Sequence, residues 1–183
     1  MAPMMNELIE AAMTASQLMS EKFMAPVLQN LVAGVGNSRD TERMSFSAKR
    51  ILIIGASGVL GAQLASTLID RGAEVIGTCS GENSAPRLAA NLNQRLLLNL
   101  EDSGSISTLS QHLISTLDYL DGIINASGLV GFGTALETTA AQRLRLMTVN
   151  HFGPAELYNQ LQPLLVAAGQ QDRSPFIAAF NGL

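Results

Sequence analysis

The stretch that most constrains the fold of this chain runs from Arg50 to Gly61 and reads RILIIGASGVLG. Ile51 to Ile54 form a short, entirely apolar run, which is typical of a strand buried on both faces of a parallel sheet. Glycines follow at three-residue spacing, and then an amphipathic pattern ends in an Arg-Gly stop, as a helix does. The order of strand, glycine turn and helix predicts the first unit of a dinucleotide-binding fold.

The glycines give a physical reason to expect a bound phosphate. A helix N-terminus has unpaired N–H groups and carries roughly half an elementary positive charge. We interpret Gly55 as the residue of the tight turn, Gly58 as the point where a pyrophosphate approaches, and Gly61 as the point where helix and strand pack closely. A glycine turn that binds no ligand is the alternative. The residues expected to bind the pyrophosphate are Gly55, Ser57, Gly58, Val59, Leu60 and Gly61.

Composition limits the classes of protein and partner. A length of 183 residues suggests one domain with a core, and a net charge of −4 gives no reason to expect nucleic acid or a membrane surface as partner. No apolar run reaches the roughly 18 residues that span a bilayer. The single cysteine, Cys79, cannot form an internal disulfide, which fits a reducing cytoplasm. Two separated histidines and one cysteine give no metal-binding constellation.

From residue 44 onward, segments with strand and helix patterns alternate, which predicts an α/β fold with right-handed crossovers. We expect a Rossmann-like, doubly wound parallel sheet with strand order 3-2-1-4-5. The expected strands lie near residues 50–55, 74–79, 95–99, 121–126 and 175–180. The expected helices lie near residues 59–71, 84–93, 103–118 and 137–168.

Residues 1–43 differ from the rest and are interpreted as an N-terminal extension, helical or poorly ordered, ahead of a domain at residues 44–183. Residues 6–24 have an amphipathic helix pattern, which Pro26 interrupts. Methionines are frequent here and would suit a docking helix. The alternatives are a poorly ordered extension and an upstream start that was wrongly included ahead of Met44.

The end of the second expected strand bears on the choice of cofactor. In a dinucleotide fold an acidic residue at this point hydrogen-bonds the adenosine ribose. Here Thr78 and Ser80 stand there, while Glu74 stands at the opposite end of the strand. The missing acid removes a repulsion against a 2′-phosphate and favours NADP over NAD, although no arginine at this point supports that choice. Glu82 is the alternative ribose ligand, of the kind that would favour NAD.

Two further strand ends carry polar or small residues that a dinucleotide could approach. Asn99 and Leu100 end the third expected strand. The fourth ends in small residues, which would let the nicotinamide-side ribose come close to the strand. These residues are Asn125, Ala126, Ser127 and Gly128.

The last long helix pattern contains Asn150, a polar residue among apolar neighbours. It is interpreted either as an ordinary helix contact or as a residue that holds water in an active site. Leu144, Met147 and Phe152 are interpreted as an apolar stripe that faces the core.

The motifs GASGVLG, NL, NASG and VNHFGP occur in this order, and from about Lys49 the chain resembles the short-chain dehydrogenase/reductase family. The resemblance implies an NAD(P)-dependent oxidoreductase acting on an alcohol or carbonyl substrate. It implies that residues 99–100 contact the adenine, with the amide oxygen of Asn99 accepting from the adenine amine. Residues 125–128 resemble the family's Asn-Asn-Ala-Gly motif, with Ala126 and Ser127 in place of Asn and Ala. The resemblance also implies that Asn150 belongs to the catalytic Asn-Ser-Tyr-Lys set.

The chain departs from the family's pattern in the remaining catalytic residues. No serine stands at residues 181–182, and neither Tyr119 nor Tyr158 is followed four residues later by a lysine. In the family this tyrosine exchanges a proton with the substrate oxygen, and the lysine lowers its pKa and holds the ribose. A positioned acid or base contributes about 10²–10⁴-fold to rate. We therefore expect a sheet that is incomplete at the C-terminus and a chain that is inactive by itself.

Three functional hypotheses follow from these residues. The first is an oxidoreductase whose sequence is incomplete here, and the second is a non-catalytic dinucleotide-binding module, working alone or completed by another chain. The third is a truncated, inactive product. An exposed edge at the fifth strand would favour association, including a homo-oligomer. The substrate is not specified by any of these residues.

Overall fold

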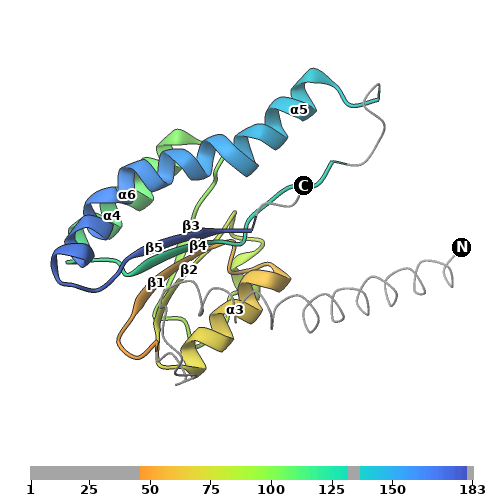
Figure 1. Cartoon of the computed structure of the whole chain (residues 1–183). Coiled ribbons are helices and arrows are strands. Elements are labelled where there is room, and N and C mark those ends of the chain that lie inside the picture. The colour runs from red at the N-terminus through yellow and green to blue at the C-terminus, as the bar shows by residue number, and fades with distance from the viewer. Residues whose placement is uncertain (1–45, 132–136, 181–183) are drawn as a thin grey trace, which may run out of the picture. The chain divides into compact units, whose positions relative to one another are not determined.

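The computed structural model describes residues 46–131 and 137–180, so the expected extension at residues 1–43 lies outside the described residues. Five parallel strands form one sheet in the order β3-β2-β1-β4-β5 (Figure 1). This is the strand order that the sequence predicts. The strands are β1 (Arg50–Ile54), β2 (Glu74–Cys79), β3 (Gln94–Leu97), β4 (Gly122–Asn125) and β5 (Phe176–Ala179).

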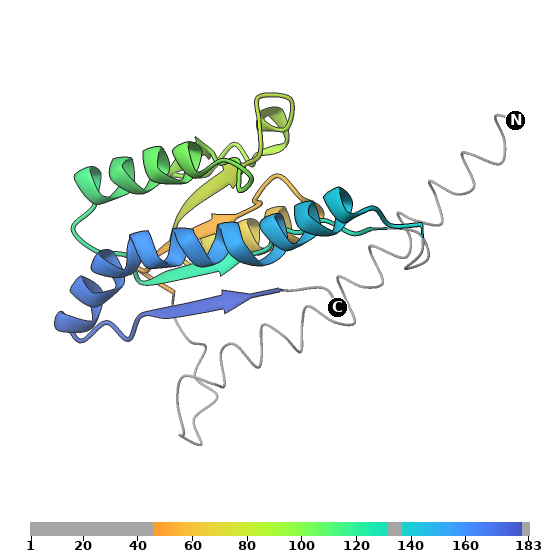
Figure 2. The same cartoon turned by 90° about the horizontal axis from the view of Figure 1, so that it is seen from above.

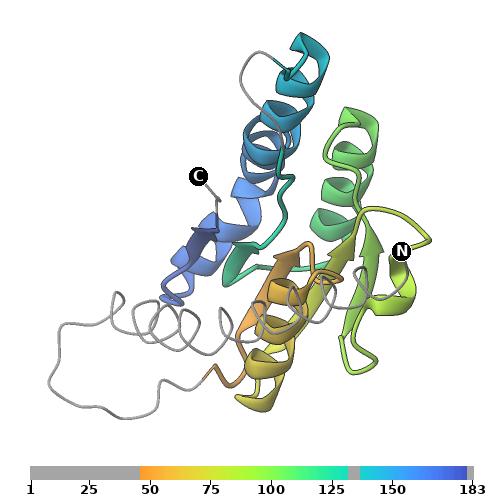
Figure 3. The same ribbon diagram turned by 90° about the vertical axis from the view of Figure 1, so that its right-hand side faces the viewer.

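Helices cover both faces of the sheet. α4 (Ser103–Thr116) and α6 (Gly153–Gln170) lie side by side on one face, as Figure 2 shows. α3 (Val59–Asp70) covers the opposite face and contacts β1 and β2 (Figure 3). The three layers place the carboxyl ends of all five strands at one edge of the sheet. No helix among the described residues is long and apolar enough to cross a membrane.

The core explains the apolar run with which the sequence analysis begins. β1 lies in the middle of the sheet, and Ile51 to Ile54 are at most 1% exposed. Their side chains are therefore buried from both faces, as expected of a central parallel strand. The core on the α4–α6 side is completed by stripes that repeat at helical spacing, namely Ile106, Leu109 and Leu113 of α4 and Leu157, Leu161 and Leu164 of α6.

The prediction of a helix at residues 84–93 is wrong. Only the 3-10 turn η2 (Ala85–Arg87) forms there. Pro86 supplies no N–H group, and the residues after the turn leave the helical path so that Leu88 and Leu92 can be buried. Leu92 packs against Gly77 of β2. A Cβ added at Gly77 would lie 2.6 Å from Cδ1 of Leu92. The apolar residues of this segment thus cap the sheet without forming a helix.

The helix expected at residues 137–168 forms in three parts. They are α5 (Ala140–Met147), a π-helical segment η3 (Thr148–Phe152) and α6. The expected core stripe is wrong, because Leu144, Met147 and Phe152 are 63%, 47% and 51% exposed. Figure 1 shows why: α5 extends past the end of the sheet, so none of its side chains reaches the core.

Candidate functional site

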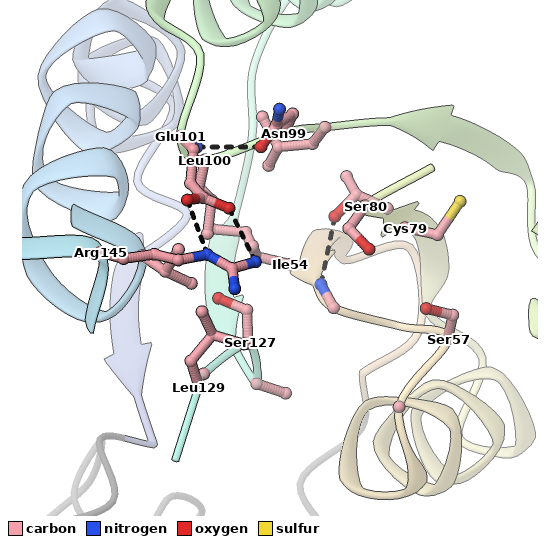
Figure 4. A pocket seen from close by; sticks show the side chains of 17 residues that line it. Ile54, Ser57, Cys79, Ser80, Asn99, Leu100, Glu101, Ser127, Leu129 and Arg145 are labelled. Carbon is pink, nitrogen blue, oxygen red and sulfur yellow. Dashed lines mark hydrogen bonds and ion pairs between the residues drawn. The ribbon is translucent and has the colours of Figure 1, made fainter. Parts of the chain in front are cut away.

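A cleft opens at the carboxyl edge of the sheet, where four strands end (Figure 4). The chain order reverses between β1 and β4, and this switch point is where open α/β sheets bind ligands. The wall of the cleft is formed by the strand ends and the turns after them, by α5 and by the π segment η3. The lining residues are Ile54, Gly55, Ser57, Gly58, Thr78, Cys79, Ser80, Leu98, Asn99, Leu100, Glu101, Ala126, Ser127, Gly128, Leu129, Arg145 and Val149.

The glycine turn has the geometry that its spacing predicts. Gly55 has a φ of +80°, and an added Cβ would lie 3.0 Å from the backbone of Ser127. At Gly61 an added Cβ would lie 2.2 Å from the carbonyl oxygen of Gly55, so only glycine lets α3 pack this closely on the turn. Apart from its chain neighbours, a Cβ added at Gly58 would have one atom within 4 Å, the carbonyl oxygen of Gly55 at 3.4 Å. Gly58 therefore keeps the lining of the cleft open at the point where α3 begins.

Among the residues that the structure describes, no side chain caps the N-terminus of α3. Gly58 is the N-cap residue, and the first turn of the helix carries no acidic residue. The positive end of the helix dipole therefore faces the cleft. Val59, Leu60 and Gly61 are not among the residues that line the cleft. Their expected contribution rests on backbone N–H groups and stays a prediction.

The end of β2 supplies hydroxyl groups and no carboxylate. Thr78 is 1% exposed, and its Oγ1 accepts a hydrogen bond from the Gly55 amide at 3.1 Å. It therefore fixes the glycine turn from behind, whereas Ser80 is exposed and lines the cleft. Glu74 lies at the start of β2 and pairs with Arg50 at 3.0 Å. Glu82, the alternative ribose ligand, does not line the cleft.

At the end of β3 the Asn99 side chain is held by its own loop. Its Oδ1 accepts a hydrogen bond from the Glu101 amide at 3.0 Å, so the oxygen expected to accept from an adenine amine already has one donor. Leu100 is buried beneath the cleft and packs against Gly153, where an added Cβ would lie 2.4 Å from the Leu100 carbonyl oxygen.

The end of β4 forms a small-residue turn that lines the cleft. Asn125 is 1% exposed and does not line it. Its Oδ1 accepts from the Ser127 amide at 3.0 Å and from the Ser127 hydroxyl at 2.6 Å. Asn125 therefore orders the turn of Ala126, Ser127 and Gly128, and these three residues form part of the surface of the cleft.

Asn150 lies in the π segment, and both the oxygen and the nitrogen of its amide form a hydrogen bond to the backbone. Its Oδ1 accepts from the Leu129 amide at 2.7 Å, and its Nδ2 donates to the Leu129 carbonyl at 2.9 Å. The side chain thus clamps the backbone that leaves β4, at a residue that does line the cleft. The catalytic, water-holding role expected for Asn150 stays a prediction.

The sequence analysis misses the two charged residues of the cleft, Glu101 and Arg145. They form a bidentate ion pair, with Nε–Oε1 at 2.9 Å and Nη2–Oε2 at 3.2 Å (Figure 4). The hydrogen bond and the charge of Glu101 raise the pKa of the Arg145 guanidinium above its ordinary value. The partners stand 44 positions apart on different elements, so no local pattern indicates the pair.

The chemistry of the cleft fits a nicotinamide dinucleotide. An uncapped helix N-terminus beside an open glycine suits a pyrophosphate, hydroxyl groups suit riboses, and apolar residues at the strand ends suit a base. Among the residues that the structure describes, no group of three or more His, Cys, Asp or Glu side chains could hold a metal ion.

Comparison with known proteins gives the family. Residues 49–174 match the family described as short chain dehydrogenase. The chain therefore belongs to the short-chain dehydrogenase family, whose members are oxidoreductases that use NAD(P).

Curated relatives match the chain over part of their length. The 3-oxoacyl-[acyl-carrier-protein] reductase FabG of Salmonella typhimurium is 36% identical over 89 residues, covering 47% of this chain and 36% of the relative. The dehydrogenase/reductase SDR family member 7B of Mus musculus is 27% identical over 123 residues, covering 67% of this chain and 36% of the relative. The chain thus spans about a third of the length of these two proteins.

Solved structures confirm the Rossmann-like fold. A 3-ketoacyl-(acyl-carrier-protein) reductase from Brucella melitensis, complexed with NADH, has a TM-score of 0.67 at 19% identity, covering 74% of this chain and 57% of that one. A short chain dehydrogenase from Shigella flexneri, complexed with NADP, has a TM-score of 0.61 at 26% identity, covering 68% of this chain and 56% of that one.

Proposed function

We propose that this protein is an NAD(P)-dependent oxidoreductase acting on an alcohol or carbonyl substrate, and that residues 46–180 hold its cofactor. The observation that carries the proposal is the uncapped N-terminus of α3, which meets the open glycine turn at the switch point of the sheet. Membership of the short-chain dehydrogenase family supports the reaction class. The single cysteine of the chain, which is buried and free, supports a cytoplasmic location.

Each part of the cleft has a proposed partner on the dinucleotide. The backbone from Gly55 to Gly61 binds the pyrophosphate, and Ser80 binds the adenosine ribose beside the turn that Thr78 holds. Residues 99–100 contact the adenine. The small residues of the turn at 126–128 leave room for the nicotinamide-side ribose. Bound in this way, the nicotinamide supplies or accepts the hydride, while the protein orients the cofactor and shields it from water.

We propose NADP as the preferred cofactor. No carboxylate lines the cleft at the end of β2, so nothing there repels a 2′-phosphate, and the hydroxyls of Ser57 and Ser80 line this part of the wall. NADPH is therefore expected to bind more tightly than NADH.

A non-catalytic dinucleotide-binding module is the second candidate function, and the composition of the cleft favours it. No histidine, lysine or tyrosine is among the lining residues of the described chain. The ionisable groups that line it are Glu101 and Arg145, which neutralise each other, and the buried thiol of Cys79. In either function the cofactor site is the same.

The test is a fluorescence titration of the purified chain with NADPH and NADH. Gly58→Asp is expected to abolish binding, because it puts a carboxylate where the pyrophosphate is proposed to lie. Gly169→Asp is the matched control, since it adds the same charge at an exposed position of α6 with room for a side chain. Failure of the wild-type chain to bind either cofactor, or unchanged affinity in Gly58→Asp, would overturn the proposal.

A further inference from the structure

α5 lies against the cleft without support from the core. None of its residues is buried, and its large apolar side chains Leu144 and Met147 face outward. The capping box of Thr139 and Gln142 stabilises the helix within its own first turn. Because a helix gains most of its stability in a protein from burying one face, the position of α5 depends on its continuation into η3 and α6 and on contacts outside the core.

The Glu101–Arg145 pair supplies one such contact. Among the hydrogen bonds and ion pairs of the described residues, it is the one that joins a side chain of α5 to the loop after β3. Both carboxylate oxygens are engaged by the planar guanidinium, and this geometry fixes orientation as well as distance. Leu146 adds a contact with Gly131 in the segment after β4.

The pair also forms part of the cleft wall. Glu101 and Arg145 both line it, and Figure 4 shows their side chains meeting above Leu129 and Ser127. The distance between the loop after β3 and α5 therefore sets the width of this part of the cleft. Paired, the two charges also present no net charge to an anionic ligand.

We propose that Glu101 and Arg145 are positioning residues that fix α5 at the width the dinucleotide requires. The inference rests on the proposed cofactor site. It adds that the position of α5 sets the affinity of this site for the dinucleotide. Without Arg145, α5 loses its link to the loop after β3 and an unpaired carboxylate is left in the cleft wall. Without Glu101, α5 loses the same link and the cleft gains a positive charge.

The experiment compares Glu101→Gln, Arg145→Gln and the exchange Glu101→Arg/Arg145→Glu by NADPH titration. Each single variant is expected to weaken binding about three- to fivefold, as suits a partly exposed ion pair, and the exchange to recover most of the loss. Glu74→Gln is the matched control. The Arg50–Glu74 pair has a similar length of 3.0 Å, and its carboxylate is as exposed as that of Glu101. It lies at the start of β2, at the end of the strand that points away from the cleft. This variant should leave NADPH affinity unchanged.

The two single variants also separate this role from direct phosphate binding by Arg145. If Arg145 were a phosphate ligand restrained by Glu101, Glu101→Gln would bind NADPH more tightly, which would overturn the proposal. Unchanged affinity in both variants would overturn it as well.

Hydrogen exchange without cofactor gives a second readout. The amides of residues 140–147 should exchange faster in both single variants, while the amides of β1 keep their protection and show that the domain is folded. Unchanged exchange in α5 would contradict the positioning role. Failure of the wild-type chain to bind any cofactor would instead refute the proposed function, and the exchange data would still decide whether the pair positions α5.

Discussion

At the scale of single residues, Asp121 concentrates more interactions than any residue of the cleft, although it lies at the opposite edge of the sheet. Its buried carboxylate accepts from Arg173 at 2.8 and 3.0 Å and from the Arg50 amide at 2.7 Å. Lys49 completes the cluster at 3.2 Å. The cluster joins β1, β4 and the segment before β5. One of the two lysines of the chain is therefore engaged in holding the sheet.

Asp121→Asn is expected to lower the free energy of unfolding by about 1–3 kcal/mol at neutral pH, because it removes the charge of a buried carboxylate that two partly exposed cations share. Denaturant unfolding measures the loss. Glu74→Gln, which breaks a more exposed pair, is the comparison and should cost far less.

The same carboxylate predicts an acid dependence of stability. Burial alone would raise the pKa of Asp121, but the hydrogen bonds from Arg173, the Arg50 amide and Lys49 outweigh it and hold the pKa below 3.8. Its stabilisation is therefore complete above pH 3.8 and is lost as the pH falls through the folded-state pKa. Wild-type protein should lose stability in this acid range more steeply than Asp121→Asn. Parallel curves would contradict the assignment.

Residue-level prediction from the sequence succeeds where the cause is local. Gly55 and Gly61 are required by the turn itself, so their spacing alone indicates it. Asn125 lies at the end of β4, as the sequence predicts, but its side chain orders the turn behind the cleft wall, and its contact with a cofactor stays a prediction. Glu101 and Arg145 were missed because a pair that joins two distant segments exists only once the sheet has brought them together.

At the scale of elements, the segment from residue 137 to 170 shows how a helix pattern can hide an interruption. Apolar residues at helical spacing predict a helix, but they do not show which of its faces packs on the core. In α5 no residue is buried. The π segment follows, and it turns Asn150 toward the backbone of Leu129. No sequence pattern distinguishes this segment from the regular helix on either side.

Asn150→Ala is expected to destabilise the fold by about 1–3 kcal/mol and to weaken NADPH binding, because it leaves both backbone groups of Leu129 without their partner. Thermal unfolding and cofactor titration measure the two effects. Asn159→Ala, at an exposed position of α6, is the matched control. If the two variants behave alike, the clamp on Leu129 contributes nothing to the site.

At the scale of the whole molecule, the topology makes the sequence motifs informative. Parallel strands joined by right-handed crossovers end at one edge, so the three motifs that stand at strand ends, GASGVLG, NL and NASG, must converge there. For this reason the order of the motifs predicts both the sheet and the cleft. The width of the cleft is not predictable in this way, since it depends on α5, none of whose own residues is buried.

The last prediction concerns turnover by the polypeptide of residues 1–183. No tyrosine in this sequence precedes a lysine by four positions. Tyr158 does not line the cleft, and burial raises its pKa above 10, the reverse of what a proton donor and acceptor at neutral pH requires. We therefore expect this polypeptide to bind NADPH without oxidising it in the presence of aldehydes and ketones.

The decisive control for turnover is protein purified from its native cell, with its intact mass measured beside its activity. Cofactor-dependent turnover by homogeneous protein of residues 1–183 would contradict the prediction and require an acid or base that the cleft does not present. Turnover only by a native protein of larger mass would agree with it. That result would identify the described domain as the cofactor-binding part of a complete oxidoreductase, and binding without turnover in both preparations would favour the non-catalytic module.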